Sequence, residues 1–377
     1  MPFLKSYVSH MFFTLHKFLA KKPAKTLSAL KTRFLTKVWP DKSIVFYTGA
    51  TPNEWNPDSL KTGIGGAEGR IIHLSREWVK QGYSVTVFNN CGNQEGTYDG
   101  VQYLNHQNFN QHDTFDTLIV WQFAWRIKFP IKATRVWLDL GKGVLLPEEA
   151  AYQKLKGYNK VFCKNIFHRS TLPEIPESKI AIIPNGIDKE FASLYEEPKD
   201  INRIIYASNY IRGLERMLEF GWPLIKSELP NAELHIFYGW GKNLDPAWKR
   251  KMLNLMEQPG VIEHGKVGRQ QMMKEKSTSA IHYYGCTFKE TDCNTVRESA
   301  LVGCVPVTTD YAALTDKSYC VKVSGNPYNE ETQKALACKV VELLKNPSEL
   351  SVIREQFVHQ VRNETWENIA KLWLAQK

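Results

Sequence analysis

Two glutamates, Glu290 and Glu298, stand eight positions apart in ETDCNTVRE (290–298), where a predicted helix begins. The first falls in the loop after an apolar run, and the second lies about one turn into the helix. Carboxylates placed there can accept hydrogen bonds from sugar hydroxyls, and the N–H groups of the first helical turn, such as those of Asn294 and Thr295, can face a phosphate. The alternative is a pair of solvated acids at a helix start, where the dipole favours negative charge anyway.

A second candidate phosphate site is the glycine-rich segment GIGGAEGR (63–70), which precedes another predicted helix. Gly65 and Gly66 allow a close approach of the backbone to a phosphate, and the helix N-terminus adds free N–H groups and a positive dipole. The alternative is a flexible turn that needs glycine for its backbone angles. The segment is not the dinucleotide-binding fingerprint, because Glu68 stands where the third glycine belongs, and this argues against a Rossmann dehydrogenase.

Both segments lie within an alternation of apolar runs and helical periodicity that occurs twice along the chain. The predicted strands of the first half are 43–49, 84–90, 116–122, 135–140, 160–165 and 179–184. Those of the second half are 203–208, 233–239, 261–265, 280–285 and 305–310, with helices near 213–227, 246–257, 269–277 and 294–302. Fully apolar strands separated by helices predict a parallel sheet covered on both faces.

The predicted fold class is therefore α/β, with two Rossmann-like doubly wound domains at 43–187 and 188–349. Ligands of open α/β sheets bind at the carboxyl ends of the strands, so a cleft is expected where the two sheets face each other. The tail, 350–377, is predicted to be a helix that crosses back to the first domain.

The residues after Glu298, SALVGCVPVTTD, complete a pattern that resembles the donor-site signature of GT-B glycosyltransferases of retaining family 4. In that family a Glu-x7-Glu motif precedes a helix, a glycine and a strand beginning Pro-Val. GGAE (65–68) resembles the family's entry loop, IPNGID (183–188) its interdomain strand, and SNYIRGLERML (208–218) the loop that opens its second domain. The four matches occur in the family's order, and the resemblance covers most of residues 43–345.

This resemblance implies a retaining glycosyltransferase that moves a hexose from a UDP- or GDP-sugar to a hydroxyl of a glycan or lipid-linked acceptor. Glu298 would hold the ribose hydroxyls, Glu290 would lie against the transferred sugar, and Arg212 would neutralise the leaving diphosphate. The other implied donor-binding residues are Gly65, Gly66, Asn294 and Thr295 around the diphosphate, and Gly265 and Val267 beside the base. No cofactor or metal is expected, because cationic groups stabilise the leaving group in this family and the chain has no Asp-x-Asp site.

The sequence departs from the family pattern at several positions. The arginine that usually precedes the Lys-Gly pair is absent from YASN (206–209), and the usual histidine is absent from WLDLGKG (137–143), which offers Asp139 as an acceptor-side contact. Asp292 and Cys293 replace the common Phe and Gly or Pro. The missing cation would have to come from Arg216, Lys242 or Lys266.

These departures keep other functions open. A non-catalytic GT-B scaffold or partner subunit would bind nucleotide or glycan without turnover, and a nucleotide-sugar epimerase would rearrange the donor without an acceptor. Trp121, Phe123 and Trp125 follow one another at the cleft end of a predicted strand, where they would either stack on sugars or pack in the core.

Composition excludes several other classes of protein. The 377 residues suit two domains, and no run reaches the ~18 uncharged apolar residues of a membrane span. Seven scattered cysteines without a Cys-x-x-Cys pair argue against a disulfide framework and a structural zinc site, and fit a reducing compartment.

The net charge of +10 is concentrated at the N-terminus. Residues 1–42 hold nine Lys and Arg against Asp41 alone, whereas the rest of the chain holds 40 basic and 38 acidic residues. The nearly neutral body argues against nucleic-acid binding. A basic amphipathic helix in 1–42 would lie on an anionic membrane surface, pack on the body, or act as a transit peptide. We expect a cytoplasmic protein, free or peripheral on a membrane through this extension.

Overall fold

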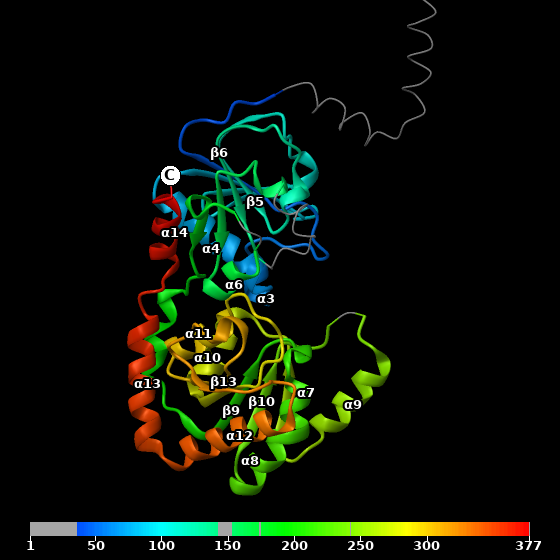
Figure 1. Ribbon diagram of the computed structural model, residues 1–377, viewed down its shortest axis with the longest axis vertical. Helices are drawn as coiled ribbons and strands as arrows, with labels where there is room; N and C mark the ends of the chain where they lie inside the picture. Colours follow the sequence, from blue (N-terminus) through cyan, green and yellow to red (C-terminus); the bar gives the residue numbers. More distant parts are fainter. Residues whose placement is uncertain (1–35, 142–152, 173–174, 242, 377) are drawn as a thin grey trace, which may run out of the picture.

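The computed structural model describes residues 36–141, 153–172, 175–241 and 243–376. They form two α/β units, one above the other in Figure 1, each built on a twisted sheet. The N-terminal unit contains strands β1 to β8 and the C-terminal unit contains β9 to β14. The predicted basic helix within 1–42 falls almost entirely outside the described residues.

The sheet of the N-terminal unit has the order β3-β4-β2-β1-β5-β6-β7-β8, and all neighbours are parallel except β3 and β4. Its strands are β1 (Ser43–Tyr47), β2 (Ser84–Asn89), β3 (Gly96–Tyr98), β4 (Val101–Asn105), β5 (Thr114–Trp121), β6 (Lys132–Asp139), β7 (Lys160–Cys163) and β8 (Ile180–Ile182). Its helices include α3 (Ser59–Thr62), α4 (Gly66–Lys80), the 3-10 turn η2 (Ala124–Arg126) and α6 (Ile166–Ser170).

The sheet of the C-terminal unit has the order β11-β10-β9-β12-β13-β14 and is parallel throughout. Its strands are β9 (Asp200–Ala207), β10 (Glu233–Phe237), β11 (Val261–Gly265), β12 (Ser279–Tyr284), β13 (Val305–Thr309) and β14 (Val321–Val323). Its helices are α7 (Leu214–Arg216), α8 (Trp222–Glu228), α9 (Pro246–Met256), α10 (Arg269–Thr278), α11 (Asn294–Leu301), α12 (Glu330–Lys345) and α13 (Pro347–Val361). A π-helical turn, Met217–Gly221, joins α7 to α8.

The central strands are buried on both faces, as their apolar sequences predict. Every residue of β12 and β13 is buried, and so are the last four residues of β6. Helices therefore have to cover both sides of each sheet, and the predicted class of two doubly wound α/β domains is confirmed.

The tail forms two helices, where the sequence predicted one. The first, α13, packs on α11 and α12 of the C-terminal unit, and α14 (Trp366–Leu374) packs on α4 of the N-terminal unit (Figure 1). Trp373 stacks on Phe162 with ring centroids 3.6 Å apart, so α14 contributes to the core of the first sheet.

The two crossings between the units lie side by side. Ile187 in the linker donates its N–H to Glu364 O at 2.8 Å, and Trp366 donates its N–H back to Ile187 O at 3.1 Å. A Cβ on Gly186 would lie 2.8 Å from Trp366, so the linker needs glycine to approach the tail this closely. No helix in the described part of the chain is both long and apolar enough for a membrane span.

Candidate functional site

Two helix N-termini, from different units, approach each other where the sequence predicts diphosphate binding. Helix α4 begins at Gly66 and α11 begins at Asn294. A Cβ on Gly66 would be 3.2 Å from Asn294 Nδ2. This distance shows how close the N-terminus of α4 lies to the N-terminus of α11. The first N–H groups of each helix, including those of Asn294 and Thr295, have no acceptor within their helix. Two positive dipole ends with free N–H groups make this a place for an anion.

The two glycines of this loop lie close to polar side chains. A Cβ on Gly65 would be 2.3 Å from the Glu68 carboxylate, and one on Gly66 would be 3.2 Å from the Asn294 side chain. Both glycines have ordinary backbone angles, since neither has a positive φ. The absence of a Cβ thus leaves the backbone of this loop open beside the start of α11.

Glu290 lies beside the start of α11 and is buried. One oxygen, Oε1, accepts hydrogen bonds from Arg212 Nη1 at 2.5 Å and from Tyr284 Oη at 2.8 Å. The Arg212 guanidinium also lies over the Phe288 ring, 4.6 Å from its centroid. Among the described residues, Oε2 has no partner, so this oxygen can accept a hydrogen bond from a ligand.

Glu298 is held by two cations from α10. Lys276 Nζ lies 2.7 Å from its Oε2 and Arg269 Nη1 lies 2.7 Å from its Oε1. Burial alone would raise the pKa of Glu298, but these cations lower it to about 2. The carboxylate is therefore ionised and fixed in direction. The sequence analysis did not single out Lys276 or Arg269, although their spacing of seven residues places them on one face of a helix.

The same arginine connects Glu298 to the linker. Arg269 Nε donates to Asp188 Oδ2 at 2.7 Å, and His73 Nδ1 on α4 lies 3.1 Å from Asp188 Oδ1. Burial lowers the pKa of His73 to about 4, so the imidazole is neutral at pH 7 and donates a hydrogen bond to Asp188. This chain of contacts joins α4, the linker and α10.

Gly265 and Val267, expected beside the base, lie at the end of β11 and in the loop after it. A Cβ on Gly63 of the N-terminal unit would be 2.8 Å from Val267 O, and one on Gly268 would be 2.0 Å from Lys61 O. The loop after α3 therefore covers the loop after β11, and the two units are in close contact on this side.

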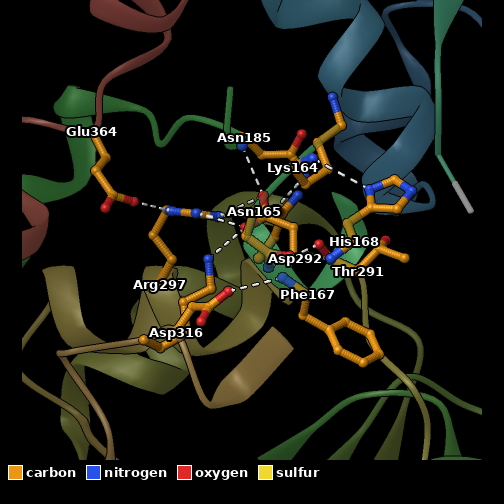
Figure 2. A network of polar contacts seen from close by, with 12 residues as sticks. Lys164, Asn165, Phe167, His168, Asn185, Thr291, Asp292, Arg297, Asp316 and Glu364 are labelled. Atoms are coloured by element: carbon orange, nitrogen blue, oxygen red, sulfur yellow. Dashed lines mark hydrogen bonds and ion pairs between the residues drawn. The ribbon is translucent and has the colours of Figure 1, made fainter. Parts of the chain in front are cut away.

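Asp292 fixes the loop between Glu290 and α11 to the linker. Its carboxylate accepts from the Asn185 N–H at 2.7 Å, from Arg297 Nη2 at 2.8 Å and from Lys317 Nζ at 2.5 Å. Figure 2 shows the contacts of Asp292 with Asn185 and Arg297 together with the ion pair between Arg297 and Glu364 of the tail. Although burial would raise the pKa of Asp292, the two cations hold it far below its usual value. Its departure from the family pattern thus has a structural role.

A second set of contacts in Figure 2 joins α6 to the same loop. Asn165 Nδ2 donates to Thr291 O at 3.1 Å, and Thr291 Oγ1 donates to Gly141 O at 3.1 Å. These bonds run between the two units, so the loop that carries Glu290 is attached to the N-terminal unit as well.

The acceptor-side contact expected of Asp139 is not what the structure shows. This residue ends β6, fully buried, and pairs with Arg70 Nη2 at 2.6 Å and Lys164 Nζ at 2.9 Å. Burial lowers the pKa of Lys164 to about 8. Because α4 places Arg70 directly against the strand end, the Asp139 carboxylate joins helix and sheet and does not face the cleft.

The candidates for the missing family cation differ in position. Arg216 pairs with Glu219 at 3.5 Å on the α7 side, and Lys242 lies outside the described residues. Lys266 is exposed, and its Cε would be 2.7 Å from a Cβ on Gly63. Of the three, Lys266 is the one seen next to the contact between the units.

The described residues contain no metal cluster, and His282 lies in the core. No group of three or more His, Cys, Asp or Glu side chains within the described ranges could hold a metal ion. His282 is buried, and its Nδ1 is 2.9 Å from Ser299 Oγ in the core.

No protein-family profile and no curated protein sequence matches this chain. Its fold does match solved structures. A glycosyltransferase from Rickettsia africae has a TM-score of 0.67 at 14% identity, over 89% of this chain and 98% of that one. The trehalose-6-phosphate synthase OtsA has a TM-score of 0.65 at 11% identity, over 88% and 98%. HepE of Anabaena, crystallised with UDP and glucose, has a TM-score of 0.62 at 10% identity, over 88% and 98%. At these identities the likeness establishes the GT-B fold.

Proposed function

We propose that this protein is a retaining glycosyltransferase that transfers a hexose from a UDP- or GDP-sugar to a hydroxyl of a glycan or glycolipid. The observation that carries the proposal is the approach of two helix N-termini, at Gly66 and Asn294, with the Glu290 carboxylate before α11 and the ionised Glu298 carboxylate on it. This arrangement supplies amide donors for a diphosphate and acceptors for the hydroxyl groups of two sugars.

The roles follow from the contacts of each residue. Glu298 uses one lone pair on each oxygen for Lys276 and Arg269, and the remaining lone pairs are available to the ribose hydroxyls. Glu290 would offer Oε2 to the transferred sugar. Arg212 has five N–H donors, of which one is used by Glu290, so others can turn to the β-phosphate.

Bond breaking would leave negative charge on the β-phosphate and positive character on the sugar. Arg212 and the amides at the two helix ends would oppose the first charge, and removal of one such donor typically costs ~2.7–4 kcal/mol. The departing phosphate would accept the proton of the acceptor hydroxyl on the same face of the sugar, so no protein group is assigned as general base. Closure of the two units would exclude water.

The test is the release of UDP or GDP from a panel of nucleotide-sugars, with and without mixed glycan acceptors. Glu298→Gln keeps the size of the side chain and removes its charge, and Glu355→Ala, on the exposed face of α13, is the control. We expect slow release from one donor, lost in Glu298→Gln and kept in Glu355→Ala. Tight nucleotide binding without release would favour the non-catalytic scaffold, and absence of binding would refute the donor site.

A further inference from the structure

An arginine at the carboxyl edge of the first sheet has no acidic partner among the residues that the structure describes. Arg126 ends η2, directly after β5, at the same sheet edge as the loop that carries Gly65 and Gly66. Its guanidinium lies on Gly49, where a Cβ would be 1.9 Å from Arg126 Nη1. Gly49 also has φ +63°, a backbone angle that favours glycine. The guanidinium therefore lies against a bare stretch of backbone beside the end of β1.

The surroundings of Arg126 leave its charge uncompensated. Within the described residues no carboxylate pairs with it, and its Nε is buried without an acceptor. Burial lowers the pKa of Arg126, and the neighbouring Tyr47 hydroxyl is neutral at pH 7 because burial raises its pKa above the usual value of 10. A partly buried cation without an anion costs free energy, and an anionic ligand would remove that cost.

Other partly buried arginines of this chain show the contrast. Arg70 pairs with Asp139, Arg135 with Asp116 and Arg203 with Glu275, each at 3.0 Å or less. Arg354 is also unpaired, but it lies on α13 against Tyr195, at the amino edge of the second sheet. Arg126 is therefore distinguished by its position at a carboxyl edge, where ligands of such sheets bind.

Two aromatic rings accompany this arginine. The guanidinium lies 5.1 Å from the Phe123 ring centroid, and Phe123 packs on Trp125 with centroids 4.6 Å apart. Trp125 is 41% exposed, whereas Trp121 is 1% exposed within the core. The structure thus separates the aromatic run of the sequence into the core residue Trp121 and the exposed Trp125, and Phe123 packs between Trp125 and the guanidinium. An exposed indole and a guanidinium on one short turn suit a sugar ring that carries a charged group.

We propose that Arg126 binds a phosphate or carboxylate group of the acceptor while Trp125 stacks on the sugar ring that carries it. The acceptor of this enzyme is then an anionic glycan. That the bound sugar is an acceptor rests on the proposed function. The binding site itself is defined by Arg126, Gly49 and Trp125. The planar guanidinium can donate two parallel hydrogen bonds to either anion.

The experiment compares three methyl hexosides that differ at one carbon: the neutral sugar, its 6-phosphate and the corresponding uronic acid. Binding without donor is measured by saturation-transfer NMR, and transfer is measured with the donor found above. The variants are Arg126→Met and Trp125→Ala, with Arg250→Met on the exposed α9 as a charge-matched control. Because Arg126 forms no ion pair with any described residue, its replacement by Met should leave the thermal unfolding temperature unchanged or raised.

We expect the wild type and Arg250→Met to bind one anionic sugar about tenfold or more tightly than the neutral sugar, and Arg126→Met to lose this preference. The preferred sugar, phosphate or uronic acid, identifies the anionic group that Arg126 binds. Equal binding of all three sugars, no binding of any, or an unchanged preference in Arg126→Met would overturn the proposal. Inorganic phosphate that competes for the site as strongly as the sugar phosphate would also overturn the proposal, because the sugar ring would then contribute nothing to the affinity. Anion preference without donor turnover would refute the transferase instead.

Discussion

The Lys276 side chain provides the sharpest test of how the Glu298 carboxylate is held. Its Nζ is fully buried and contacts Glu298 Oε2 at 2.7 Å and both Thr295 O and Oγ1 at 3.0 Å. Replacement by Met keeps the length of the side chain and leaves Glu298 with Arg269 alone. Removal of one partner from a buried ion pair costs about 3–5 kcal/mol, so the free energy of unfolding should fall by roughly that amount at pH 7.

The pH dependence gives a second estimate. The pKa of Glu298 is about 2 in the folded protein against an ordinary value of 4.5. At about 1.4 kcal/mol per pH unit, this difference corresponds to roughly 3 kcal/mol of stability. A lowered pKa means that this contribution is complete above pH 4.5 and is lost as the pH falls towards 2. The difference in the free energy of unfolding between wild type and Lys276→Met should therefore become smaller as the pH falls over the same range.

Urea unfolding at pH 7 and at pH 3 measures both effects. The control is Lys371→Met, which breaks the Lys371–Glu367 pair, similar in length at 2.8 Å but exposed on α14. Water screens that pair, so its loss should change stability little. The double variant Glu298→Gln/Lys276→Met should recover part of the stability that Lys276→Met loses, because the buried carboxylate that lost its lysine is then neutral. A cost below about 1 kcal/mol for Lys276→Met, or the same cost at both pH values, would show that the pair does not hold Glu298.

Two further predictions concern turnover and closure. Arg212→Met should lower kcat by about 10²–10³ with a smaller change in KM, because the charge of the arginine is needed most when the diphosphate leaves. Single-turnover transfer measures the rate of the chemical step. An effect on KM alone would contradict this role of Arg212. Gly268→Ala should hold the two units apart, since its Cβ would be 2.0 Å from Lys61 O. Small-angle scattering should show a larger radius of gyration, and kinetics should show a raised KM for the donor. Unchanged values of both would contradict the prediction, because the contact between Gly268 and Lys61 would then adjust at little cost.

The fold could be predicted from sequence because the parallel strands are continuous apolar runs. The predicted strand 203–208 is observed as Asp200–Ala207 and 305–310 as Val305–Thr309. The hairpin of β3 and β4 was not predicted, since its strands are short and half exposed and leave no apolar run. The break in the tail also depends on tertiary contacts, because Glu364 is engaged by Ile187 and Arg297 from elsewhere in the chain.

The partners of the site residues were less accessible to sequence reasoning. Glu290 and Glu298 could be found from their spacing, but the cations on Glu298 come from a helix 22 and 29 positions away in the chain. Asp139 was assigned to the acceptor because its segment, WLDLGKG (137–143), stands where the family usually has a histidine. Arg70 is 69 positions away and reaches Asp139 only once α4 packs on the sheet. Ion pairs between distant segments have no sequence period, so a residue's type and local context cannot reveal them.

These contacts change the electrostatic argument for the reaction. The resemblance assigned Arg212 to the diphosphate, yet in the structure this arginine is paired with Glu290, and Lys276 and Arg269 are paired with Glu298. A donor carrying two phosphates would therefore meet cations whose charge is already compensated, and the amides at the two helix ends would have to supply much of its binding. The Arg212 guanidinium, shared between Glu290 and the phosphate, would turn towards the phosphate as negative charge grows there. Such a redistribution favours the transition state over the bound donor, which is the condition for catalysis.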